Sequence, residues 1–224
     1  MLTDYVPGSA LMYKRNPDYW MKDPLHPANQ VPYVDGLKQL IITDVSTRLA
    51  AFRTAKLDFV GIYPNVTFDD AQTLMKSNPQ LKYKVVSGAD KQLWMRTDKT
   101  DLPFKDVKVR QALNLAVDQP EIVKSYYRGE AELLGHPYPP FKAWEPLYTP
   151  LNQMPASVQD LFTYNPDKAK KLLSDAGYPN GFEVGMDCPN DRYVNDEKIC
   201  QAVVAMLAKI GVKVNRKAQT RNLY

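Results

Sequence analysis

Few residues of this chain have the types and spacing that covalent chemistry requires. The two histidines, His26 and His136, are far apart and each is followed by Pro. No GxSxG, P-loop, HExxH, CxxC or GxGxxG pattern occurs. We therefore expect no nucleophilic or acid–base catalysis, no metal site and no cofactor. The residues favour a binding protein over an enzyme.

The acidic pairs Asp69/Asp70 and Asp196/Glu197 have a structural interpretation. Each pair lies where a helix is expected to begin. The positive end of the helix dipole favours carboxylates at that position. We therefore do not assign them to a catalytic site.

The two cysteines, Cys188 and Cys200, leave two alternatives open. They are either buried thiols or a disulfide that closes a loop of about 13 residues and contributes about 3 kcal/mol. A disulfide would place the protein in an oxidising compartment. The N-terminal residues lack the basic and apolar regions of a signal peptide. On the disulfide alternative, we expect the chain to be a mature or trimmed piece of an exported protein.

The composition is that of a globular protein. Of 224 residues, 44% are hydrophobic and 24% charged, which excludes a disordered or fibrous chain. The 29 Lys and Arg and 25 Asp and Glu give a net charge of +4, spread along the chain. This even distribution argues against a nucleic-acid partner. No apolar run approaches the roughly 20 residues that span a bilayer.

The first ninety residues predict a mixed layer of strands and helices. Asp44 and Thr67 precede apolar stretches with helical spacing and are expected to cap them. Alternation of apolar residues predicts the strands. The expected strands are 10–14, 37–42, 81–86 and 91–97, with a short extended piece at 57–62, and the expected helices follow residues 44 and 67.

The second half predicts longer helices and an α/β arrangement. Asp106, Asp118 and Asn165 are the expected caps, and Gly177 and Gly211 end helices. Between them, the Pro- and aromatic-rich segment 135–164 is expected to be a long ordered loop. Helix, strand, helix and strand then alternate, as in an α/β layer. The expected strands are 182–188 and 212–218, and the last helix is 195–210.

Five segments carry recognisable motifs, among them KRNPDYW and, later in the chain, PFKDVKVRQAL. In this order the five resemble the extracellular solute-binding proteins of peptide and nickel ABC importers, known as family 5. The first is similar to that family's RNPxYW signature, and PFKDVKVRQAL is similar to a later block. Each motif alone is weak, but five in order over nearly the whole chain are specific. The matching segments are 14–20, 32–58, 103–113, 165–182 and 210–214.

The resemblance implies a mixed α/β, two-lobed fold of the type II periplasmic binding protein kind. It implies that this chain is an internal fragment, because family members are about twice as long. Residues 1–88 would belong to the first lobe and residues 89–224 to the other large lobe. The implied function is capture of peptides in the periplasm and delivery to ABC transporter permease subunits in the inner membrane.

Two alternatives to peptide capture remain at this point. One is a structural or interaction module that binds no solute. The other is a receptor of the same family for a nickel chelate, haem, opine or sugar. The shortage of histidine argues against direct metal ligation by this chain.

Trp94, Arg96 and Asp98 form the first group of candidate ligand-binding residues. The family often has an Asn ahead of the Pro-Phe pair, and here Arg96 or Asp98 falls at that position. In a strand, Trp94 and Arg96 would face the same side. An Arg beside an aromatic ring suits a ligand that carries a carboxylate. The alternative is that Arg96 pairs with a nearby Asp and Trp94 is core.

Asn190, Arg192 and Tyr193 form the second group. They lie in a loop between an expected strand and the helix that follows it. In α/β layers, ligands bind at that end of the strands, facing the helix N-terminus. The alternative is a loop held only by its own ion pair and by a Cys188–Cys200 bridge.

Overall fold

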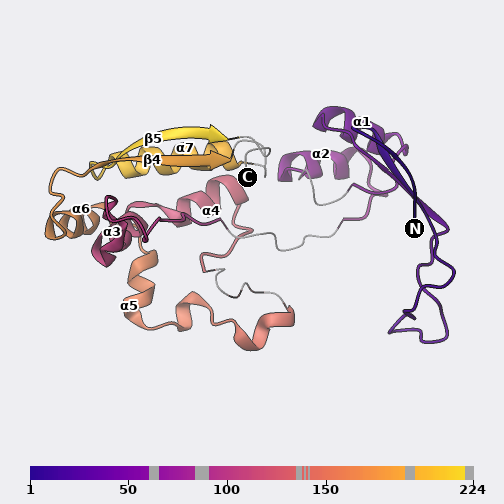
Figure 1. The fold of residues 1–224 in the computed structure, drawn as a ribbon, viewed down its shortest axis with the longest axis horizontal. Coiled ribbons are helices and arrows are strands. Elements are labelled where there is room, and N and C mark those ends of the chain that lie inside the picture. Colours follow the sequence, from indigo (N-terminus) through magenta and orange to yellow (C-terminus); the bar gives the residue numbers. More distant parts are fainter. Residues whose placement is uncertain are drawn as a thin grey trace. The chain divides into compact units, whose positions relative to one another are not determined.

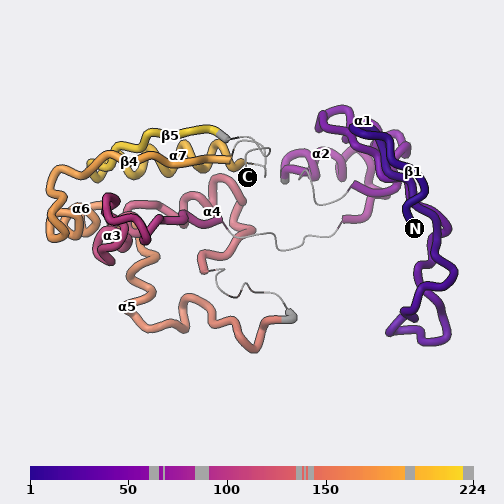
Figure 2. Tube along the Cα trace, viewed as in Figure 1, coloured from indigo at the N-terminus to yellow at the C-terminus, as the bar shows by residue number. Residues whose placement is uncertain are grey.

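The structure is a computed structural model that describes residues 1–60, 66–83, 91–134, 138, 140, 142–189 and 195–219. The chain forms two compact units, residues 1–61 and 62–224 (Figures 1 and 2). Both contain helices and strands, so the mixed α and β class predicted from the sequence is confirmed. The predicted lobe boundary at residue 88 lies outside the described residues.

The first unit is a three-stranded antiparallel sheet with β2 in the centre, followed by one helix. The second and third strands and the helix were expected. Asp44 caps the helix by accepting a hydrogen bond from the Thr47 amide at 2.7 Å. The first strand was not predicted, because Asp4 shares a face with Leu2 and Val6 and the sequence shows no apolar face. The elements are β1 (Leu2–Val6), β2 (Ala10–Lys14), β3 (Gly36–Leu40) and α1 (Val45–Arg53).

The second unit consists mainly of helices around one apolar core. Its described elements are α2 (Phe68–Ser77), α3 (Val107–Ala116), α4 (Gln119–Tyr127), α5 (Ala156–Gln159), α6 (Pro166–Asp175), β4 (Glu183–Pro189), α7 (Asp196–Ala208), β5 (Lys213–Gln219) and 3-10 turns at Pro103–Lys105, Lys142–Leu147, Leu151–Gln153 and Asp160–Phe162.

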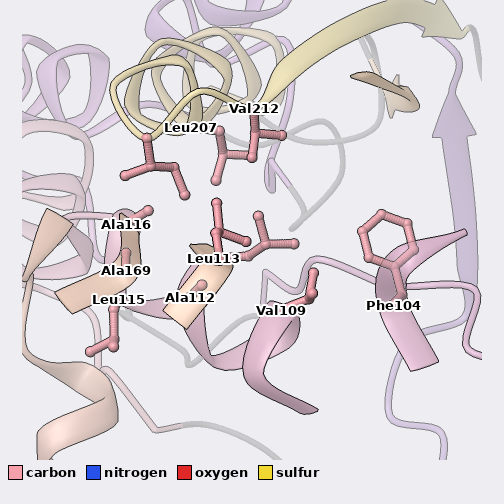
Figure 3. Close-up of a cluster of buried hydrophobic side chains, with 11 residues drawn as sticks. Phe104, Val109, Ala112, Leu113, Leu115, Ala116, Ala169, Leu207 and Val212 are labelled. Carbon is pink, nitrogen blue, oxygen red and sulfur yellow. The ribbon is translucent and has the colours of Figure 1, made fainter. Parts of the chain in front are cut away.

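Side chains from α3, α6 and α7, together with Val212 just before β5, make most of the core of this unit. Figure 3 shows Leu113 of α3 directed toward Val212, with Leu207 of α7 and Ala169 of α6 beside them. All four are buried. Apolar residues with helical spacing on α3 and α6 therefore form the faces that pack together.

The predicted caps of the second unit are confirmed. Thr67 accepts a bond from the Asp70 amide at 3.0 Å, and Asn165 accepts one from the Lys168 amide at 2.9 Å. Asp106 and Asp118 cap α3 and α4 in the same way. Each cap satisfies an amide that the first turn of the helix leaves unpaired.

The last elements form a β–α–β unit in which β4 and β5 are parallel and α7 contacts both strands (Figure 1). The strands start beside two glycines that touch. Gly181 and Gly211 both have positive φ, at 76° and 87°, and a Cβ on Gly181 would collide with the Gly211 carbonyl. Glycine is therefore required where these turns meet.

One expectation about local structure was wrong: residues 91–97 belong to neither described sheet. The expected strand 81–86 and the expected extended piece 57–62 lie only in part within the described residues, of which 81–83 and 57–60 are outside any strand. Alternating apolar residues satisfy a strand pattern, but a strand also needs a hydrogen-bonded neighbour, which the pattern does not supply. The described part of the predicted loop 135–164 contains a short helix and 3-10 turns, since its prolines limit each helical run to a few residues.

Candidate functional site

The candidate site lies at the carboxyl end of β4, where the chain leaves the strand and returns as α7. Cys188, at the end of β4, is bonded to Cys200 in α7, with the Cα atoms 6.3 Å apart. The disulfide alternative is therefore confirmed. Cys188 is also fully buried. The bridge fixes the start of the 189–195 connection against the helix that follows it.

A buried carboxylate fixes the other end of this connection. The Asp196 side chain is only 4% exposed, and its Oδ1 accepts a hydrogen bond from Lys91 Nζ. Asn195, which precedes it with a positive φ of 69°, donates from Nδ2 to the Tyr126 carbonyl at 3.2 Å. Residues 91 and 126 thus both meet the N-terminus of α7.

Tyr127, the last residue of α4, faces the same carboxylate. Its hydroxyl is buried and has no hydrogen-bond partner among the described residues. Burial, and secondarily the negative charge of Asp196, raise the pKa of Tyr127. The hydroxyl therefore stays protonated and is a neutral hydrogen-bond donor beside the N-terminus of α7.

The segment that begins at Lys91 carries the first group of candidate residues. Met95 packs against the apolar core, whereas Trp94 is 80% exposed. Arg96 is exposed as well and forms a two-pronged ion pair with Asp98, with Nε–Oδ1 at 2.8 Å and Nη2–Oδ2 at 2.7 Å. This pairing raises the pKa of Arg96 and lowers that of Asp98.

These contacts bear on the structural alternative for the first group. The expectation that Arg96 pairs with a nearby Asp is confirmed, and the expectation that Trp94 is a core residue is wrong. The segment is not a strand, so the expected alternation of its side chains does not apply. Trp94 and Arg96 are nevertheless both exposed. With its charge compensated by Asp98, Arg96 receives a ligand carboxylate only in competition with that Asp.

The second group, Asn190, Arg192 and Tyr193, lies outside the described residues. The structure does describe what holds the connection at each end: the disulfide after β4 and the Lys91–Asp196 pair at α7. The segment that carries the first group is therefore joined to the connection that carries the second.

Lys91, Tyr127 and Asp196 were not identified as site residues from the sequence. Lys91 and Asp196 are separated by 105 positions, and the sequence gives no signal that they meet. Asp196 was assigned to the helix dipole alone. An acidic first-turn residue preceded by Asn and followed by an apolar stripe is compatible with either role.

Elsewhere in the described residues, no second site of this kind was found. Two open hollows of about 500 and 520 Å³ lie beside the end of α4 and the 148–163 segment, and none of the predicted site residues lines them. Within the described residues, no cluster of His, Cys, Asp or Glu is arranged to hold a metal ion. The same part of the chain has no helix long and apolar enough to cross a membrane.

Comparison with known families places this fold. A sequence model described as "Bacterial extracellular solute-binding proteins, family 5 Middle" matches residues 1–224. The chain belongs to this family. The resemblance seen in the five sequence segments is thus confirmed over the whole chain, and the family is one of solute-binding proteins.

Individual relatives of this family 5 chain bind different solutes according to their names. Heme-binding protein A of Haemophilus influenzae is 34% identical over 220 residues, covering 96% of this chain and 36% of that protein. Glutathione-binding protein GsiB of Escherichia coli is 30% identical over 183 residues, covering 82% of this chain and 32% of that protein. The chain thus spans about a third of the length of these relatives, so the expectation that family members are about twice as long was too low.

Solved structures show the same fold. The periplasmic binding protein DppA of Helicobacter pylori, in complex with the peptide STSA, matches with a TM-score of 0.70 and 26% identity, over 100% of this chain and 38% of that one. The dipeptide-binding protein of a Pseudoalteromonas species, in complex with Met-Leu, matches with a TM-score of 0.67 at 24% identity. The latter likeness concerns the fold alone.

Proposed function

We propose that this chain is part of the substrate-binding component of an ABC transporter that captures peptides. The observation that carries the proposal is the family match over residues 1–224. The likeness to a DppA structure that holds a peptide favours peptides among the family's solutes. The protein would work in the periplasm and deliver its ligand to permease subunits in the inner membrane, and it would perform no catalysis itself.

The ligand-binding residues of this proposal are the two groups named from the sequence. They are Trp94, Arg96, Asp98, Asn190, Arg192 and Tyr193. The Lys91–Asp196 pair and the disulfide support this proposal, because they fix the segments that carry both groups to one β–α–β unit. Side chains on anchored segments bind with a smaller loss of conformational entropy. In such receptors the peptide main chain supplies hydrogen bonds and its charged termini supply ion pairs.

The proposed lobes are residues 1–88 and 89–224. A cleft between two lobes needs both walls, and this chain spans about a third of its relatives' length. We therefore propose that part of the binding cleft is formed by segments of the whole protein that this chain does not contain. Ligand binding is accordingly best measured on a longer natural version that includes residues 1–224.

Haem is the second candidate ligand, favoured by one observation. The relative named heme-binding protein A matches at 34% identity over nearly the whole chain. Glutathione, named for another relative, is itself a peptide and falls under the first proposal. A nickel chelate, opine or sugar, and a module that binds no solute, are the remaining alternatives.

A thermal-shift and calorimetric titration of the longer protein tests the proposal. A ligand that binds only the folded state increases the free energy of unfolding, by about 2.7 kcal/mol at a ligand concentration of one hundred times its Kd. The melting temperature rises as a result. The panel contains di- and tetrapeptides, glutathione, haemin, a nickel chelate and a sugar. Stabilisation by peptides alone supports the proposal. Stabilisation by haemin alone transfers it to the second candidate, and stabilisation by none of the panel contradicts both.

A further inference from the structure

The hydroxyl of Tyr127 is a buried hydrogen-bond donor that the proposed function does not use. Less than 1 Å² of its oxygen is accessible, and it has no hydrogen-bond partner among the described residues. Buried polar groups are nearly always paired, because a buried donor without an acceptor has lost its bonds to water and gained nothing in return. The position of this phenol therefore needs an explanation.

Tyr127 ends α4 and lies beside the first residues of α7. The carbonyl of the preceding residue, Tyr126, accepts a hydrogen bond from Asn195 Nδ2 at 3.2 Å. Burial, and then the negative charge of Asp196, raise the pKa of Tyr127, so this carboxylate is close enough to act on the phenol. An acceptor thus lies near the hydroxyl, although the two groups are not hydrogen-bonded in the described arrangement.

The Asp196 carboxylate is well suited to receive the Tyr127 hydroxyl. Its side chain is only 4% exposed, and its Oδ1 accepts a hydrogen bond from Lys91 Nζ. A carboxylate accepts several hydrogen bonds at once, so a bond from the phenol does not require the loss of the lysine. Hydrogen bonds to a charged acceptor are also stronger than those between neutral groups. A shift that brought α4 and α7 together at this point would therefore be rewarded by a strong bond.

Both groups of candidate ligand-binding residues lie on segments that end at this carboxylate. Lys91 lies three positions before Trp94, in the first group, and bonds Asp196. Asp196 itself lies three positions after Tyr193, the last residue of the second group. A solute held by both groups therefore restrains both partners of the Lys91–Asp196 pair.

We propose that Tyr127 is a positioning residue: binding of a solute brings its hydroxyl to the Asp196 carboxylate, and the hydrogen bond that forms stabilises the bound protein. This inference rests on the proposed function, because it assigns to the same site a residue that strengthens binding without touching the solute. The hydroxyl donates and the carboxylate accepts, and no proton is transferred. In the free protein the hydroxyl contributes nothing to stability.

The experiment uses Tyr127→Phe, which removes the hydroxyl and keeps the ring. The longer natural protein that includes residues 1–224 is titrated calorimetrically with the tetrapeptide STSA in one arm and with haemin in the other. Urea unfolding without solute measures the stability of the free protein. Tyr126→Phe is the matched control, because it removes the neighbouring hydroxyl and keeps the carbonyl that Asn195 contacts.

The inference predicts that affinity and stability respond differently. Tyr127→Phe is expected to weaken binding of the solute by about ten- to one-hundred-fold, as for the loss of a hydrogen bond to a charged group. The urea midpoint of the free protein should stay the same or rise, because the variant removes an unpaired buried donor. A merely structural hydroxyl would instead lower this midpoint when removed. Tyr126→Phe should change neither quantity.

The acceptor is tested by repeating the comparison in the background of Asp196→Asn. A neutral amide oxygen accepts a weaker hydrogen bond than a carboxylate does. The loss of affinity caused by Tyr127→Phe should therefore be about five-fold smaller in this background. An equal loss in both backgrounds would show that Asp196 is not the acceptor and would overturn the proposed bond.

Three further results would overturn the inference in distinguishable ways. A lower urea midpoint of the free Tyr127→Phe protein would mean that the hydroxyl is already bonded without solute. Unchanged affinity of Tyr127→Phe for both STSA and haemin would remove the role of Tyr127 and leave the proposed function standing. If the unchanged protein binds neither probe, the proposed function fails and the role of Tyr127 fails with it.

Discussion

The Lys91–Asp196 pair offers the sharpest test of the site's architecture. Replacing Lys91 by Met removes the ammonium from a carboxylate that is 4% exposed and leaves that charge buried. Lys91→Met, Asp196→Asn and the double variant form a thermodynamic cycle that isolates the interaction between the two side chains. The structure predicts that the two substitutions are not additive.

The expected magnitude follows from burial. At an effective dielectric constant of about 20, two unit charges about 4 Å apart interact by about 4 kcal/mol. The Lys91 side chain is one-third exposed, so water screens part of this energy. We expect a coupling energy of about 1–3 kcal/mol. Lys91→Met alone should then lower Tm by several degrees, at about 2–4 °C per kcal/mol for a protein of this size.

Urea unfolding of the four proteins, followed by circular dichroism, measures the cycle. The exposed pair Arg96–Asp98 is the matched control. Its side chains are 64% and 61% exposed, so the corresponding cycle of Arg96→Met and Asp98→Asn should show a much smaller coupling. A coupling between Lys91 and Asp196 within about 0.3 kcal/mol of zero, the ordinary error of additivity, would refute the reasoning.

Three further predictions concern the rest of the second unit. Replacing both cysteines by Ser should lower the free energy of unfolding by about 3 kcal/mol, because the unfolded chain regains the freedom of a loop closed over 12 positions. Urea unfolding curves with and without reductant measure this difference. Identical curves of the wild-type protein under the two conditions would contradict the prediction. Leu173→Ala should lower the free energy of unfolding by about 2–5 kcal/mol, because the side chain is fully buried. Leu172 is only partly buried, so Leu172→Ala should have a smaller effect, and calorimetry of both variants measures the difference. Hydrogen bonds from Gln201 and then Arg216 lower the pKa of Glu197 from its usual 4.5. The ionised carboxylate therefore stabilises the fold above that pH and the contribution is lost as pH falls below it. Glu197→Gln should flatten the acid limb of a Tm–pH curve, and an unchanged limb would count against the assignment.

The features predicted from the sequence are those determined by neighbouring residues. Asn165 caps α6 and Thr67 caps α2 because each side chain reaches an amide three positions ahead. The apolar stripes of α3 and α6 follow in the same way from helical spacing. These local rules located most helices and the β4–α7–β5 unit to within a few residues.

The features that could not be predicted depend on distant partners. Residues 91–97 have the alternation of a strand, yet the chain pairs them with neither described sheet. Lys91 and Asp196 meet across 105 positions, which no single-sequence pattern encodes. The exposure of Trp94 is of the same kind, because burial depends on what surrounds a residue and not on its type.

The two touching glycines before β4 and β5 also constrain how this protein can change. Any side chain at Gly181 would strike the Gly211 carbonyl, and a Cβ at Gly211 would lie 2.9 Å from the Asn180 carbonyl. Each substitution introduces a clash of its own and places a side chain on a residue with positive φ, so exchanging one glycine does not make the other dispensable. A different turn here would require the entries of both strands to be rebuilt together.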